Sequence, residues 1–264
     1  MKRAAFLLLL TSAVSAQAQE ARELCTDRPG LGTPPCTVAP GGVVVEVGVG
    51  EWTRDRTDAA RTDTFVAGDA LVRIGIAEYA EVQAGWAAFG HTRERDRASD
   101  AVDSNTGVGD VTLALRRNLA NPNGSDTSIA VMPYVSLPTG GGAIGAGDWS
   151  AGLIVPMSHE VTDGLTVTLS PEVDAAVDED RSGRHLAYGG VAGLSIDLSD
   201  TLSGSGELLL MRDRDPGGHA TMAQAGLSLA WQPARDLQID FGGNIGLAHA
   251  SPDIVAYAGI ARRF

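Results

Sequence analysis

The sequence predicts an all-β protein: a single closed antiparallel transmembrane β-barrel with up-and-down (meander) topology. Three observations carry this prediction. Apolar and polar residues alternate from residue 41 to the end of the sequence, the breaks between alternating stretches are by turns short and long, and the final residue, Phe264, is apolar. Short turns on one rim and long loops on the other are typical of outer-membrane barrels.

The first 18 residues have the order of an export signal. Lys2 and Arg3 precede an apolar run over residues 4–10, and Ala16-Gln17-Ala18 offers a cleavage site between small residues. The run is too short to cross a bilayer as a helix. We therefore expect residues 1–18 to be removed as a signal peptide. Because no later run reaches the roughly 18 apolar residues of a membrane helix, membrane residence requires a β-barrel.

Residues 19–40 are predicted to form an N-terminal segment, lying either in the periplasm or inside the barrel as a plug. Cys25 and Cys36 are the only cysteines, and prolines and glycines separate them. An oxidising periplasm favours a disulfide between them. The alternative is a metal site, but two sulfurs without a nearby histidine are only half of a zinc shell.

Residues 41–264 are predicted to form the barrel. In the stretch 237–247, Leu237, Ile239 and Phe241 share one face while Gln238 and Asp240 share the other, which is the period of a strand. Similar stretches indicate about twelve strands. We place them at residues 41–52, 64–75, 80–90, 106–117, 127–137, 148–159, 164–175, 185–197, 201–212, 219–231, 236–247 and 253–264. An even number of strands leaves both termini in the periplasm.

Three prolines, Pro133, Pro156 and Pro171, lie inside these predicted strands. Proline cannot donate a ladder hydrogen bond, so we expect bulges or kinks there. The alternative fold is a secreted β-sandwich, whose strands would show the same alternation. The order of short and long breaks and the terminal Phe264 favour the barrel.

The charge excludes one class of partner. The chain has 20 basic and 33 acidic residues, a net charge of −13. An acidic surface repels the phosphates of nucleic acids, so we expect no nucleic-acid partner.

The inward face of the barrel is the predicted functional surface. Charged residues project there between Gly, Ala, Ser and Thr. They are solvated by channel water in an open pore or paired with arginine in a filled core, and their excess of acids would make an open pore prefer cations. The lumen-facing candidates are Glu46, Glu81, Arg116, Glu172, Asp174, Asp197, Glu207 and Asp240.

Two other patterns suggest chemistry at the outer rim. His91, His185, His219 and His249 fall near the long breaks, with Ser182 or Ser251 as nominal nucleophiles of a rim enzyme. A rim histidine is more often a solvated residue than a base. The acids Asp178, Glu179, Asp180, Asp213 and Asp215 are interpreted as a solvated rim, with weak divalent-ion binding as the alternative. We thus expect no catalytic residue, cofactor or dedicated metal site.

Several short motifs resemble the outer-membrane family labelled MetA-pathway of phenol degradation transporters. They are Thr26-Asp27-Arg28-Pro29, Pro40-Gly41-Gly42, residues 109–116 (GDVTLALR), residues 133–140 (PYVSLPTG) and residues 259–264 (GIARRF). The resemblance covers the chain that follows the signal and implies an outer-membrane barrel for small, often aromatic, compounds. The chain departs from the family pattern in its cysteine pair and in Arg262.

Together these patterns predict a bacterial outer-membrane barrel for passive uptake of a small solute, with aromatic or hydrophobic compounds as candidates. The alternatives are an enzyme acting at the outer rim and a non-conducting structural or adhesion barrel. The expected partners are outer-membrane lipid, the solute, and the barrel-assembly machinery, which would bind through the C-terminal Phe264.

Overall fold

The structure is a computed structural model, and it describes residues 22–264. All regular structure in this range is β-strand. The strands are β1 (Val43–Arg56), β2 (Ala60–Ala77), β3 (Ala80–Asp96), β4 (Val102–Gly107), β5 (Val111–Ala120), β6 (Thr127–Leu137), β7 (Ser150–Ile154), β8 (Met157–Thr162), β9 (Leu165–Val177), β10 (Arg184–Ser199), β11 (Leu202–Asp215), β12 (Gly218–Ala234), β13 (Leu237–Gly246) and β14 (Ile254–Arg263). Within the described range, no helix has the length and apolar character needed to cross a membrane. The expected signal peptide, residues 1–18, lies outside the described residues.

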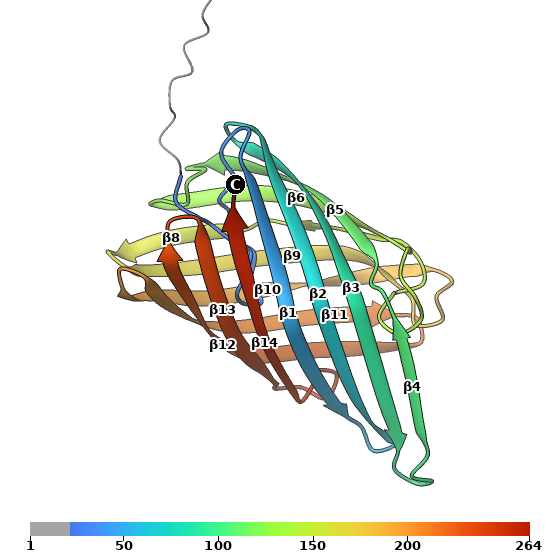
Figure 1. The fold of residues 1–264 in the computed structure, drawn as a ribbon. Helices are drawn as coiled ribbons and strands as arrows, with labels where there is room; N and C mark the ends of the chain where they lie inside the picture. The colour runs from blue at the N-terminus through green and yellow to red at the C-terminus, as the bar shows by residue number, and fades with distance from the viewer. Residues whose placement is uncertain (1–21) are drawn as a thin grey trace, which may run out of the picture.

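The sheet closes into a barrel. Neighbouring strands pair antiparallel, and β14 pairs with β1 so that Val44 lies opposite Arg263. β4 and β5 both pair with β3, and β7 and β8 both lie between β6 and β9, so each pair fills one position in the wall. The 14 strands therefore fill 14 − 2 = 12 positions (Figure 1). The predicted up-and-down barrel of about twelve strands is confirmed.

The break between β7 and β8 falls at Val155-Pro156, where a kink was predicted. Proline has no N–H to continue the ladder. Pro171 lies opposite this break in β9, and its carbonyl accepts a hydrogen bond from Val155 N at 2.9 Å. Pro133 stays inside β6, beside a gap in the β5–β6 pairing between Tyr134 and Val131. The prolines thus interrupt ladders locally without opening the barrel.

The two faces of the barrel wall have inverted polarity compared with a soluble protein. Outward side chains are large and apolar, and many are well exposed, for example Leu227 (75%), Phe241 (53%) and Leu169 (45%). Inward side chains include fully buried charged groups such as Arg73 and Glu81. Apolar groups belong outside only where lipid replaces water, so the exterior is a lipid-facing surface.

The two ends of the barrel differ in their connections. At the end that carries the C-terminus, tight turns such as Glu78-Tyr79 join the strands, whereas the β3–β4 hairpin projects from the other end (Figure 1). Short turns face the periplasm in barrels of this kind. The strands predicted at residues 41–52, 64–75 and 80–90 are too short at this end, because β1 extends to Arg56, β2 begins at Ala60 and β3 extends to Asp96. Cross-strand ion pairs such as Arg54 Nε–Asp63 Oδ1 (2.8 Å) extend the ladder there.

Candidate functional site

Residues 22–42, which we call the N-terminal segment, fold into the barrel before β1 begins. At the short-turn end, Arg22 Nη2 lies 2.6 Å from Glu78 Oε1. The segment contacts residues of β1, β9, β11 and β13, which lie on different sides of the wall, so it occupies the lumen (Figure 1). It then returns to the short-turn end, where Thr37 N donates to Pro122 O.

The disulfide Cys25–Cys36 joins the part of the N-terminal segment that enters the lumen to the part that leaves it. The two Cα atoms are 6.4 Å apart, with a sequence separation of 11. The predicted cysteine pairing is confirmed. The cross-link closes a loop whose tip, near Leu31 and Thr33, reaches the middle of the opposite wall.

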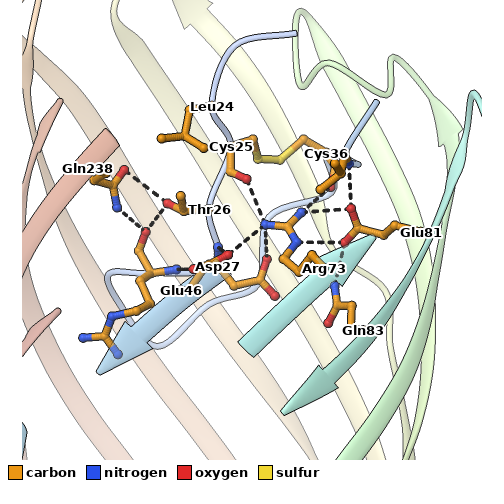
Figure 2. A network of polar contacts seen from close by, with 12 residues as sticks. Leu24, Cys25, Thr26, Asp27, Cys36, Glu46, Arg73, Glu81, Gln83 and Gln238 are labelled. Atoms are coloured by element: carbon orange, nitrogen blue, oxygen red, sulfur yellow. Dashed lines mark hydrogen bonds and ion pairs between the residues drawn. A yellow bond between two sulfur atoms is a disulfide. The ribbon is translucent and has the colours of Figure 1, made fainter. Parts of the chain in front are cut away.

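Arg73 of β2 is the centre of the contacts between the segment and the wall (Figure 2). Its guanidinium is fully buried and lies 2.9 Å from Glu81 Oε1, 3.1 Å from Glu46 Oε1 and 3.0 Å from Asp27 Oδ1. It also donates hydrogen bonds to the carbonyl oxygens of Cys25 (2.8 Å) and Cys36 (3.3 Å). One side chain therefore holds both disulfide-linked arms of the segment against the wall.

Arg116 of β5 completes an ionic cluster consisting of Asp27, Glu46, Arg73, Glu81 and Arg116. Its Nη2 lies 2.7 Å from Asp27 Oδ2, and Nη1 lies 3.3 Å from Glu81 Oε1. Burial raises the pKa of Asp27, but the charges of Arg116 and Arg73 outweigh burial and hold this pKa below its ordinary value. Two arginines thus face three carboxylates, and removal of either arginine would leave more buried negative charge uncompensated.

Backbone groups of the segment also bind to this side of the wall. Glu46 accepts hydrogen bonds from Asp27 N and Arg28 N, both at 2.9 Å, and Glu81 accepts one from Val38 N at 2.6 Å. The approach is close at Gly75 of β2, where an added Cβ would overlap the Ala39 carbonyl. Glycine is therefore required where the segment meets the wall.

The far wall holds the segment through fewer groups. Glu207 of β11 accepts hydrogen bonds from Leu31 N (2.6 Å) and Gly32 N (3.1 Å). Ser170 of β9 accepts from Thr33 N at 3.2 Å and donates to Thr33 O at 2.8 Å. On β13, Asp240 Oδ1 lies 3.1 Å from Arg28 Nη2. These contacts fix the tip of the segment, and they leave space elsewhere along the far wall.

That space is a cavity of about 370 Å³ between the N-terminal segment and strands β9–β12. Its wall side, which we call the hydroxyl wall, consists of small polar side chains. They are Thr166, Thr168, Ser195, Ser203, Ser205 and Ser228. Ser205 Oγ and Ser228 Oγ are 2.6 Å apart and hydrogen-bonded to each other. The lumen is therefore filled on one side and hollow on the other.

Beyond the tip of the segment, toward the long-hairpin end, two inward carboxylates lie together on β9. The Tyr134 hydroxyl is 2.9 Å from Glu172 Oε1 and 2.6 Å from Asp174 Oδ1. Its single proton can be donated to only one of them at a time. Among the described residues, neither acid forms an ion pair with an arginine.

The structure distributes the sequence-predicted lumen residues over four environments. Glu46, Glu81 and Arg116 lie in the ionic cluster, and Asp240 and Glu207 hold the segment elsewhere. Glu172 and Asp174 lie beyond the tip. Asp197 is exposed near the short-turn end, where its N–H donates to Gly164 O.

The residues that complete the site come from separate segments of the sequence. Asp27 and Arg28 come from the N-terminal segment, and Arg73 and Tyr134 are inward residues outside the candidate set. Arg73 falls on the inward face of a strand, and its neighbours in the sequence are apolar. This position was the available sign that Arg73 belongs to the site. No sequence pattern indicated which oppositely charged residues Asp27 and Arg28 would meet.

The nominal rim nucleophiles do not meet a histidine in the described part of the chain. Ser182 Oγ donates to Asp180, and Ser251 Oγ hydrogen-bonds with the Ala223 backbone. His185 instead lies among Asp178, Asp213 and Asp215.

A closed barrel with a lipid-facing apolar exterior, a polar interior, and short and long ends is a bacterial outer-membrane β-barrel protein. The model of the family described as "Putative MetA-pathway of phenol degradation" matches residues 26–264. The chain belongs to this family, as the sequence motifs indicated. Among curated proteins, no sequence matches the chain.

Solved structures support the fold. The COG4313 outer membrane channel from Pseudomonas putida F1 is similar over 89% of this chain and 100% of its own, with a TM-score of 0.70 and 15% identity. The NanC porin is similar over 83% of this chain and 98% of its own, with a TM-score of 0.52 and 8% identity. The KdgM porin in complex with disordered oligogalacturonate covers 84% of this chain and 99% of its own, with a TM-score of 0.51 and 10% identity.

Proposed function

We propose that the protein mediates passive uptake of a small solute, which crosses the lumen between the N-terminal segment and the hydroxyl wall. The observation that carries this proposal is the asymmetric filling of the lumen. The segment is held by the ionic cluster on β1, β2, β3 and β5, while the cavity of about 370 Å³ lies against β9–β12. A passage of this size suits small molecules one at a time rather than the wide flow of a general porin.

Small aromatic or hydrophobic compounds are the solute class we favour. Membership of a family described by a phenol-degradation pathway supports this choice. A phenolic compound presents one hydroxyl and one apolar ring, and the hydroxyl wall offers donors and acceptors next to small side chains that leave room for a ring. The passage therefore combines polar and apolar contacts.

The domain organisation is part of the proposal. Residues 1–18 would be removed as a signal, residues 19–40 would form the plug, and residues 41–264 the barrel.

The backbone N–H of Phe264 donates to Val43 O, whereas the residue as a whole is 71% exposed. The terminal ring is therefore accessible. We propose that the barrel-assembly machinery binds this ring. Phe264→Ala should lower the amount of barrel assembled in the outer membrane without changing the stability of the purified barrel.

Single-channel recording in planar lipid bilayers tests the transport proposal. The purified protein should conduct ions in small, uniform steps in KCl. Thr168→Trp, which would fill the cavity, should lower the conductance. Leu169→Trp on the lipid face of the same strand is the matched control and should leave it unchanged. A wild-type protein that inserts but does not conduct would favour the structural or adhesion alternative and contradict the proposal.

A further inference from the structure

Four side chains from three neighbouring elements converge at the outer rim, far from the N-terminal segment along the barrel. His185 lies at the start of β10, Asp178 follows the end of β9, and Asp213 and Asp215 lie at the end of β11. His185 Nδ1 is 2.9 Å from Asp178 Oδ1 and 3.3 Å from Asp215 Oδ2. Its Nε2 is 2.8 Å from Asp213 Oδ1. The His185 imidazole is therefore enclosed by three carboxylates. We call these four side chains the rim cluster.

The cluster is held in place by backbone groups. Asp215 Oδ2 accepts a hydrogen bond from Glu179 N at 2.7 Å, and Asp215 Oδ1 accepts one from Gly217 N at 2.6 Å. Asp213 Oδ1 accepts a hydrogen bond from Asp215 N at 2.9 Å. The carboxylates of Asp213 and Asp215 are thus oriented before any ligand arrives, which lowers the cost of forming a binding site.

The charge of the rim cluster is unbalanced. Among the described residues, none of its three carboxylates forms an ion pair with an arginine. A protonated imidazole would leave a net charge of −2, whereas a neutral imidazole with a bound dication would leave −1. A cavity of about 240 Å³ adjoins the cluster, and its lining adds Glu179 and Asp180 to Asp178 and Asp215. More negative charge is therefore gathered here than the described residues neutralise.

The imidazole supplies a second, independent observation. The His185 side chain is only 5% exposed, and its buried Nε2 has no aligned hydrogen-bond partner although Asp213 Oδ1 is at 2.8 Å. A metal-bound histidine commonly directs its other ring nitrogen at a carboxylate, which fixes the ring and the tautomer. With the proton on Nε2 facing Asp213, the Nδ1 lone pair faces Asp178 and Asp215. Nδ1 and Asp178 Oδ1 form a hydrogen bond at 2.9 Å in the structure, and a bound ion would take the place of its proton.

We propose that His185, Asp178 and Asp215 bind a transition-metal dication such as Zn²⁺, with Asp213 orienting the imidazole. The three ligand groups lie within 4.8 Å of one another. In a tetrahedral zinc site with bonds of about 2.0–2.1 Å, ligand atoms are separated by about 3.3 Å. His185 Nδ1 lies 2.9 Å from Asp178 Oδ1 and 3.3 Å from Asp215 Oδ2. Imidazole favours zinc and its neighbours over Ca²⁺ and Mg²⁺, which prefer oxygen ligands alone. The ion would tie the β9–β10 loop to the β11–β12 hairpin.

Isothermal titration of the untagged protein in detergent with ZnCl₂ tests this site, because a polyhistidine tag would itself bind zinc. One Zn²⁺ should bind per chain, and Ca²⁺ should bind far more weakly. His185→Gln and Asp215→Asn should each weaken zinc binding at least about tenfold, as should the orienting variant Asp213→Asn. Asp103→Asn on the β3–β4 hairpin removes one exposed carboxylate elsewhere and is the matched control, with unchanged affinity.

Co²⁺ provides a second readout, because coordination by His185 should change its visible absorption and His185→Gln should abolish that change. The unfolding transition of each variant, measured in parallel, checks that the barrel is intact. Absence of zinc binding by the folded wild-type protein would overturn the proposal. So would zinc binding that His185→Gln leaves unchanged, or a Ca²⁺ affinity equal to that for Zn²⁺. None of these outcomes depends on whether the barrel conducts.

Discussion

The two sides of the lumen follow the same alternation of apolar and polar residues but carry different inward side chains. On β1, β2, β3 and β5 the inward positions hold Glu46, Arg73, Glu81 and Arg116, all fully buried against the N-terminal segment. On β9–β12 the inward positions that line the cavity hold the serines and threonines of the hydroxyl wall together with Glu207. Alternation therefore determines the fold, whereas the size and charge of the inward residues determine where the lumen is filled.

Removing the central arginine should give the largest effect. Arg73→Ala leaves Asp27, Glu46 and Glu81 with only Arg116 to compensate them. We expect the free energy of unfolding to fall by about 3–5 kcal/mol, the usual cost of leaving buried charge unpaired. Urea unfolding of the wild type and the variant in lipid vesicles measures this loss of unfolding free energy.

Thr168→Ala on the hydroxyl wall is the control for that experiment, and it should change the free energy of unfolding by no more than about 0.5 kcal/mol. Similar losses in the two variants would mean that the two sides of the lumen do not differ as described.

The next effect concerns the lipid-facing side of the same wall. Leu169→Arg places a guanidinium in the apolar exterior and should cost about 2–4 kcal/mol of unfolding free energy if the site lies near the bilayer midplane. Thr168→Arg, one residue away and directed into the cavity, should cost much less, because water and nearby hydroxyls can solvate the charge. Equal losses in vesicle unfolding experiments would contradict the assignment of faces in β9.

Ion selectivity should respond more modestly to the outer carboxylates. Glu172 and Asp174 lack arginine partners among the described residues, so they give the passage a negative potential that attracts cations. Wild-type channels should prefer K⁺ over Cl⁻ in reversal potentials measured across a KCl gradient. The double variant Glu172→Gln, Asp174→Asn should reduce that preference toward none. Anion preference in the wild type, or an unchanged reversal potential in the double variant, would exclude these residues from the pathway.

The smallest expected effect concerns the labelling of the two cysteines. Because Cys25 and Cys36 are disulfide-bonded, a maleimide added to the folded, untreated protein should label neither of them. Labelling should appear only after a reductant is added, and mass spectrometry can count the modified thiols. Labelling before reduction would show that the two arms of the segment are not cross-linked.

The sequence was sufficient to predict the barrel, because a strand wall with lipid on one side and a lumen on the other imposes a period of two on every strand. It was also sufficient for the disulfide and for the inward parity of Glu46, Glu81 and Arg116. The meeting of Arg73 with Asp27 could not be predicted, since their 46-residue separation carries no periodic signal (73 − 27). The extent of β1, β2 and β3 beyond the membrane was missed because charged stretches can pair as strands through ion pairs such as Arg54–Asp63.

The most direct test of the account is cysteine modification on the two sides of the lumen. The described protein has no free cysteine, so Ser195→Cys on the hydroxyl wall and Gln83→Cys beside the ionic cluster each introduce a single thiol. The cationic reagent MTSET is added during single-channel recording, and mass spectrometry reports the extent of labelling. We expect MTSET to lower the conductance of Ser195→Cys and to leave that of Gln83→Cys unchanged. Block at Gln83→Cys with no effect at Ser195→Cys would place the passage on the other side of the N-terminal segment and contradict the account.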